Sequence, residues 1–121
     1  MSRITTHVLD TVLGKPATGI FVRLYRFLGG WVEEGSGRVP SGEWLEISSG
    51  VTDADGRCNH LQPDAATGIY RLTFESGSYF KQLDRASIYP EISVTFDCDG
   101  AAHYHLPLLL SGNSYTTYRG S

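Results

Sequence analysis

The chain has 121 residues, of which 40% are hydrophobic and 19% are charged, a composition typical of a soluble globular protein, and we predict one domain over residues 1–121. The formal net charge of −3 at pH 7 argues against nucleic acid as a partner, because phosphate backbones bind basic surfaces. No segment approaches the ~20 apolar residues that span a bilayer, and the N-terminus lacks a secretory signal, so we expect no membrane partner and a cytoplasmic location.

Short runs of β-branched and aromatic residues alternate with Gly, Pro, Asp and Asn along the chain, a spacing typical of an all-β sandwich or barrel. We predict about eight strands and one short helix, without an internal repeat. In chain order, the predicted strands cover residues 4–9, 19–27, 31–34, 44–47, 69–74, 92–98, 103–110 and 115–119, and the predicted helix covers 76–84. Tight turns are expected at 14–16, 53–56 and 111–113, and a loop at 35–42.

The alternation of side chains with a period of two predicts the inward faces of these strands. The residues expected to face the core are Ile20, Val22, Leu24, Tyr70, Leu72, Phe74, Ile92, Val94, Phe96 and Cys98. In the helix, Tyr79, Phe80 and Leu83 are expected to form the apolar side. Cys58 and Cys98 make no disulfide framework, and in a reducing compartment we expect two free thiols.

The strand at 103–110 has two faces of different character. The residues expected to face the core are Tyr104, Leu106, Leu108 and Leu110. His103 and His105 therefore project from the opposite face. Pro107 lies on the histidine side and cannot donate a ladder hydrogen bond, which predicts an edge or a bulge there. In a lone sandwich the two imidazoles would face water, whereas packing against another subunit would enclose them in a cleft.

His7 and His105 are the candidate bases, because imidazole titrates nearest to neutral pH. Taken alone, either histidine is more often a solvated surface residue, and Arg57 is more often a solvated loop charge. Within ~4–6 Å of a histidine, however, Arg57 would disfavour the imidazolium form and hold the ring neutral. The same guanidinium could stabilise a developing oxyanion.

The C-terminus combines a phenol, a guanidinium and a hydroxyl in the tetrapeptide Tyr118, Arg119, Gly120 and Ser121. One interpretation is a frayed polar tail, since most termini fray. The other is a terminus that folds inward over a small polar ligand, where the hydroxyls of Tyr118 and Ser121 would orient substrate or water.

Two pairs of potential metal ligands occur, His103 with His105 and Cys58 with His60, and their chemistry suits zinc. No acidic or third ligand stands at a familiar spacing, so we predict no metal site. The sequence also lacks a Gly-x-Ser-x-Gly nucleophile elbow and a glycine-rich phosphate loop. With a metal site, a nucleophile elbow and a phosphate loop excluded, the remaining mechanism is direct attack by a water molecule that a histidine activates.

The chain resembles the 5-hydroxyisourate hydrolases, the enzyme branch of the transthyretin-like proteins, in motifs that span nearly the whole sequence in order. The matching stretches are Thr6-His7-Val8-Leu9-Asp10, Gly14-Lys15-Pro16-Ala17, Asp55-Gly56-Arg57, Tyr79-Phe80, Pro90-Glu91-Ile92, His103-Tyr104-His105-Leu106-Pro107-Leu108-Leu109 and Tyr118-Arg119-Gly120-Ser121. The terminal tetrapeptide is the most discriminating of them, because the hormone-carrier branch of these proteins lacks it.

The resemblance implies a transthyretin-like sandwich of two four-stranded sheets with one short helix, assembled as a homotetramer, a dimer of dimers whose central channel holds the active sites. It implies hydrolysis of 5-hydroxyisourate to 2-oxo-4-hydroxy-4-carboxy-5-ureidoimidazoline, a step of urate degradation in purine catabolism, without metal or organic cofactor. The catalytic residues it implies are His7, Arg57 and His105. The substrate-binding residues it implies are Tyr118, Arg119, Gly120 and Ser121, while His103 is left unassigned.

Two other functional classes stay open at this point. A non-catalytic carrier would bind a small planar ligand in the same channel, but we would expect it to lack the terminal tetrapeptide and to have apolar groups at the His and Arg positions. A protein-binding sandwich module has no specific feature in its favour. One departure from the expected pattern is the segment 27–50, which is longer and richer in Gly and Trp than the resemblance implies.

Overall fold

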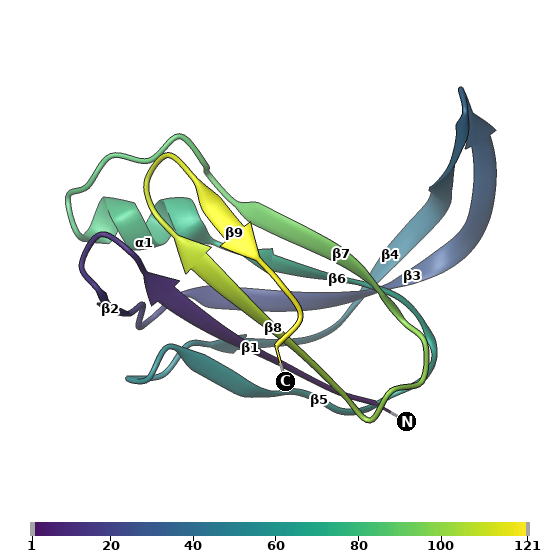
Figure 1. Cartoon of the computed structure of the whole chain (residues 1–121), viewed down its shortest axis with the longest axis horizontal. Helices are drawn as coiled ribbons and strands as arrows, with labels where there is room; N and C mark the ends of the chain where they lie inside the picture. Colours follow the sequence, from purple (N-terminus) through teal and green to yellow (C-terminus); the bar gives the residue numbers. More distant parts are fainter. Residues whose placement is uncertain (1, 121) are drawn as a thin grey trace.

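A computed structural model describes residues 2–120 and consists mainly of strands, with one short helix (Figure 1). Its elements are β1 (Ser2–Asp10), β2 (Lys15–Pro16), β3 (Phe21–Glu34), β4 (Gly37–Val51), β5 (Arg57–Ala65), β6 (Gly68–Phe74), α1 (Ser76–Gln82), β7 (Ile92–Cys98), β8 (His103–Leu110) and β9 (Tyr115–Thr117). The predicted all-β class is confirmed, and so is the short helix, which ends two residues earlier than expected. No helix in this described part of the chain is long and apolar enough to cross a membrane.

The strands form two sheets. In the first sheet, β1 pairs in parallel with β8, which pairs with β9, while β5 and β2 both pair with β1. Because β8 occupies one edge of β1, β5 and β2 share the other edge, and the sheet is four strands wide. The second sheet has the order β4-β3-β6-β7. The predicted sandwich of two four-stranded sheets is therefore confirmed, with β2 as a short addition.

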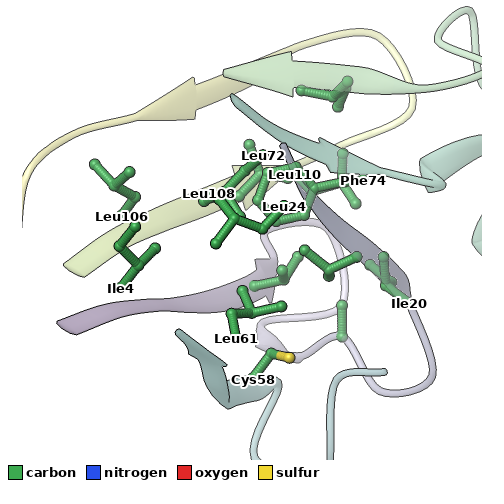
Figure 2. Packing of buried hydrophobic residues seen from close by; sticks show 14 of the residues in the cluster. Ile4, Ile20, Leu24, Cys58, Leu61, Leu72, Phe74, Leu106, Leu108 and Leu110 are labelled. Atoms are coloured by element: carbon green, nitrogen blue, oxygen red, sulfur yellow. The ribbon is translucent and has the colours of Figure 1, made fainter. Parts of the chain in front are cut away.

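The core lies between the inner faces of the two sheets. Figure 2 shows Leu108 and Leu110 of β8 close to Leu24, Leu72 and Phe74 of the second sheet, and Leu106 of β8 beside Ile4 of β1. The inward faces predicted for β3, β6 and β8 are confirmed, since all of these side chains are buried. Each large side chain buried in this way contributes roughly 1.5–3 kcal/mol to folding. The polar residues that alternate with them on β1 and β8 are therefore directed to the outer face of the first sheet.

The predicted loop at 35–42 is wrong. β3 and β4 pair from Phe21 with Val51 to Glu34 with Gly37, with one register shift between Leu24 and Tyr25, and the chain reverses in a two-residue turn at residues 35 and 36. Gly35 has φ 56°, a conformation that such hairpin turns require. All residues from 28 to 43 are exposed, so no inward-facing apolar series marks these strands. The hairpin projects from the body of the sandwich in Figure 1.

Strand β5 was not predicted at all. Its sequence contains Asn59, Pro63 and Asp64, which are poor strand formers, and its pairing with β1 shifts register twice. Such residues are tolerated because β5 is an edge strand of the first sheet. A second error concerns Leu83, which follows α1 and is 45% exposed instead of forming part of the apolar side of the helix.

The predicted turn at 53–56 is confirmed and has a direct role in placing Arg57. One oxygen of the Asp53 carboxylate accepts hydrogen bonds from the N–H groups of Asp55 and Arg57, at 2.9 and 3.0 Å. Gly56 adopts φ 74°, and a Cβ on it would stand 2.4 Å from the carbonyl oxygen of Val8. The turn therefore packs against β1 and starts β5 with Arg57 directly beside that strand. The predicted free thiols, Cys58 and Cys98, are both free and buried.

Candidate active site

Three neighbouring strands, β5, β1 and β8, direct polar side chains to the outer face of the first sheet. In the parallel pairing of β1 with β8, Arg3 stands opposite His103 and Thr5 opposite His105. In the antiparallel pairing of β1 with β5, His7 stands opposite Arg57. Because directly paired residues project to the same side of a sheet, these side chains share one face.

A pocket of ≈ 390 Å³ opens on this face. The side chains that line it are Arg3, Thr5, Arg57, Asn59, His103 and His105. Of the three predicted catalytic residues, the structure brings Arg57 and His105 together in the pocket and puts His7 beside it, next to Arg57 in the sheet. A larger pocket of ≈ 550 Å³ lies beside α1, but it contains no histidine, and its Arg85 is paired with Asp10.

Thr5 connects the two imidazoles of the pocket. Its Oγ1 lies 2.8 Å from Nε2 of His103 and 2.8 Å from Nδ1 of His105, and the ring centroids are 5.9 Å apart. The residue is only 3% exposed. Sequence reasoning did not select Thr5, Arg3 or Asn59, and it left His103 unassigned. The alternation of Arg3, Thr5 and His7 along β1 was a signal that could have found two of them.

The surroundings of the two histidines favour their neutral forms. Burial lowers the pKa of His105, and the positive charges of His103, Arg57, His7 and Arg3 lower it further. Burial also lowers the pKa of His103, with a smaller effect from the guanidinium of Arg3. A neutral imidazole can accept or donate a proton near pH 7, which is the property that acid–base catalysis needs.

The C-terminal tail runs along β8 and reaches this site. Leu108 pairs with Thr117, and His105 forms a bridge with Gly120, so the register is the same at both points. Pro107 pairs with His7 of β1 but has no ladder partner on the tail side, where the pairing is interrupted opposite Tyr118, between β9 and the bridge. The strand edge predicted at Pro107 is therefore present on that side, where the missing N–H breaks no ladder hydrogen bond.

The residues of the tail point in different directions. Gly120 donates its N–H to the carbonyl of His105 at 2.7 Å, and a Cβ on Gly120 would stand 2.8 Å from Cδ2 of that ring. Arg119 lies over the ring of Tyr104, 4.3 Å from its centroid, on the opposite face of the sheet from His105. Tyr118 is 51% exposed. Ser121 lies outside the described residues.

The potential metal ligands of this region do not come together in one site. His103 and His105 are joined through Thr5, while Cys58 faces the core and His60 is exposed, so the two pairs do not share a site. Within residues 2–120, no group of three or more His, Cys, Asp or Glu side chains is arranged to hold a metal.

Comparison with known proteins places the chain among relatives of one family. The family model described as HIUase/Transthyretin family matches residues 4–120. The chain is 40% identical to 5-hydroxyisourate hydrolase of Mus musculus over 99% of its own length and 96% of the mouse protein. It is 39% identical to 5-hydroxyisourate hydrolase of Pseudomonas aeruginosa over 100% of its own length and 93% of that protein.

Solved structures give the same result. The structure of Klebsiella pneumoniae 5-hydroxyisourate hydrolase superposes with a TM-score of 0.81 and 34% identity, covering 100% of both chains. Transthyretin from Sparus aurata superposes with a TM-score of 0.83 and 29% identity, covering 99% of this chain and 97% of the fish protein. Because both the sequence and the fold match these relatives over nearly the whole chain, the chain belongs to the HIUase/transthyretin family.

Proposed function

We propose that this chain is a hydrolase that opens the six-membered ring of 5-hydroxyisourate to give 2-oxo-4-hydroxy-4-carboxy-5-ureidoimidazoline, in urate degradation and without a cofactor. The observation that carries the proposal is that Arg57 and His105, from distant parts of the chain, line one pocket together. The names of the relatives from Mus musculus and Pseudomonas aeruginosa support the choice of substrate.

In the proposed reaction, the imidazole of His7 or His105 takes a proton from water as the water oxygen attacks a ring carbonyl. The lowered pKa of His105, due first to burial and then to nearby positive charges, supports a neutral ring at pH 7. Arg57 stabilises the negative charge on the attacked oxygen. Acid–base help of this kind and an oxyanion donor each accelerate a reaction by roughly 10²-fold or more.

We further propose that the site works in a homotetramer, a dimer of dimers, in which another subunit covers the outer face of the first sheet. The membership of the transthyretin family supports this assembly. Substrate binding by Tyr118, Arg119, Gly120 and Ser121 is part of the same proposal, and the contact of Gly120 with His105 supports it best. A cytoplasmic location stays a prediction from the sequence.

The rival function is a carrier that binds a small planar ligand without changing it. It has a basis in the similarity to transthyretin, including a sea bream structure in complex with thyroxine. The lining of the pocket favours the hydrolase, because two arginines, two histidines, a threonine and an asparagine suit a polar substrate that acquires charge.

The experiment that separates these functions follows the ultraviolet absorbance of freshly generated 5-hydroxyisourate with and without the protein. The hydrolase should remove the substrate far faster than it decays spontaneously, at a rate proportional to protein concentration. Decay at the spontaneous rate, together with saturable binding of the compound, would support the carrier instead.

A further inference from the structure

We propose that Thr5 sets the tautomer of His105, so that this ring offers an N–H donor at Nε2 to the pocket and His7 acts as the base. Thr5 is then a positioning residue for the reaction proposed above, and the catalytic part of the inference rests on that proposed function. The tautomer itself is a property of the free protein, and its test needs no substrate.

The single hydroxyl proton of Thr5 limits how this residue can bond to the two imidazoles. A hydroxyl has one proton, so it donates one hydrogen bond and accepts others through its lone pairs. Oγ1 of Thr5 has two imidazole nitrogens at 2.8 Å, one from His103 and one from His105. Among residues 2–120, the Thr5 hydroxyl has no other hydrogen-bond acceptor, so its proton goes to one of these two nitrogens. That nitrogen is bare, and the other one carries a proton when its bond to Oγ1 is formed. The tautomers of the two histidines are therefore coupled through Thr5.

Arg3 selects one of the two possible directions. Its guanidinium is always protonated and can only donate, and one of its nitrogens lies 3.5 Å from Nδ1 of His103. This contact is long, but the positive charge at that distance also favours a bare Nδ1. His103 then carries its proton on Nε2 and donates to Thr5. Thr5 donates in turn to Nδ1 of His105, which leaves the proton of His105 on Nε2.

The position of the His105 ring makes this proton available to a ligand. Its Nδ1 is occupied by Thr5, and Gly120 lies against its Cδ2 edge. Among residues 2–120, no hydrogen bond is made to its Nε2, and the ring lines the pocket. In this arrangement the Nε2–H group of His105 donates to the oxygen that becomes negative, beside the guanidinium of Arg57.

The base in this arrangement is His7, which stands outside the Thr5 chain and opposite Arg57 in the sheet. It takes a proton from water as the water oxygen forms its bond to the ring carbonyl carbon. When the carbon–nitrogen bond breaks, its electron pair remains on the nitrogen, and His7 returns the proton there. His105 keeps its proton throughout, so no charge moves along the chain of Arg3, His103 and Thr5.

The direct test is nitrogen NMR of the histidine-labelled protein without substrate, with the signals assigned by His103→Gln and His105→Gln variants. The proposal predicts that His105 carries its proton on Nε2 and has a bare Nδ1. Thr5→Val keeps the branched shape but removes the hydroxyl, and it should produce a mixture of the two His105 tautomers and lower kcat/KM about 10-fold, as for one misdirected hydrogen bond to a charged oxygen. Thr5→Ser should restore both properties.

Arg3→Gln is a second variant that should change the tautomer of His105. Because Arg3 is exposed, its replacement should leave the fold intact. It should also increase the share of His105 that carries its proton on Nδ1. A wild-type His105 protonated on Nδ1 would overturn the proposal, and so would a folded Thr5→Val variant with an unchanged tautomer and unchanged turnover. If the protein does not hydrolyse 5-hydroxyisourate at all, the tautomer measurement still stands, so the two failures are distinguishable.

Discussion

The backbone of Gly120 lies in direct contact with the imidazole of His105, fifteen positions earlier in the chain. The Gly120 N–H donates to the His105 carbonyl at 2.7 Å, and a Cβ on Gly120 would stand 2.8 Å from Cδ2 and 3.5 Å from Cγ of the ring. Gly120 therefore packs against the ring of His105, a proposed catalytic residue, and restricts its position.

A Gly120→Ala substitution should displace this ring, because a Cβ contact of 2.8 Å is closer than carbon atoms tolerate. Displacement by about 1 Å at a reacting group is expected to lower kcat/KM by up to roughly 10²-fold. The matched control is Gly30→Ala in the exposed part of β3, where an added Cβ meets no atom within 4 Å. Both variants should keep the wild-type circular dichroism spectrum, and equal activity in the two would contradict the proposed role of the tail.

Asp10 is expected to make stability depend on pH. Burial alone would raise the pKa of Asp10, but hydrogen bonds from Arg85, the Leu13 N–H and Tyr79, together with the Arg85 charge, lower it from 3.8 to about 2. Since the pKa is lower in the folded state, the stabilisation is present above pH 4 and is lost as the pH falls through about 2. The stabilisation amounts to about 2.5 kcal/mol, from about 1.4 kcal/mol per pKa unit.

The measurement is the free energy of unfolding between about pH 6 and pH 1.5 for the wild type and Asp10→Asn. The wild type should lose stability more steeply below pH 4, so that the two curves converge at low pH. Asp55→Asn, at an exposed turn position, is the control and should follow the wild-type curve. Parallel curves for the wild type and Asp10→Asn would show that the pKa of Asp10 is not lowered by folding.

The projecting hairpin should be dispensable for folding. Residues 28–43 are all exposed, and Gly29 pairs directly with Gly42, so a two-residue Asn-Gly turn can replace residues 30–41 without a change of register. Because no buried side chain is removed, the free energy of unfolding should change by no more than about 1 kcal/mol. Chemical denaturation of the shortened protein tests this expectation, and failure of the shortened chain to fold would contradict it.

Much of the fold follows from the sequence because its central strands have one apolar face. Val22, Leu72 and Leu108 lie in strictly alternating segments, and each is buried as the alternation predicts. Strand β5 and the outer half of the β3–β4 hairpin have no such pattern, since one is an irregular edge strand and the other is exposed on both faces. The spacing of residues carries little information about strands of these two kinds.

The candidate site was less accessible to sequence reasoning. Thr5 and His105 are 100 positions apart, and only the parallel pairing of β1 with β8 brings them together. Threonine is also an ordinary strand residue, so its place between two imidazoles gives no signal in the sequence. The grouping of His7, Arg57 and His105 was expected from the resemblance to a family, and their spacing in the chain alone could not have predicted it.

The most direct test of the proposed site compares two arginine variants in the hydrolysis of freshly generated 5-hydroxyisourate. Arg57 lines the pocket on the first sheet, whereas Arg71 lies on β6 of the second sheet and contacts Thr95 and Trp44. The account predicts that Arg57→Gln lowers kcat/KM by roughly 10²-fold or more, while Arg71→Gln retains the wild-type value. Wild-type turnover in Arg57→Gln, or an equal loss in both variants, would contradict it.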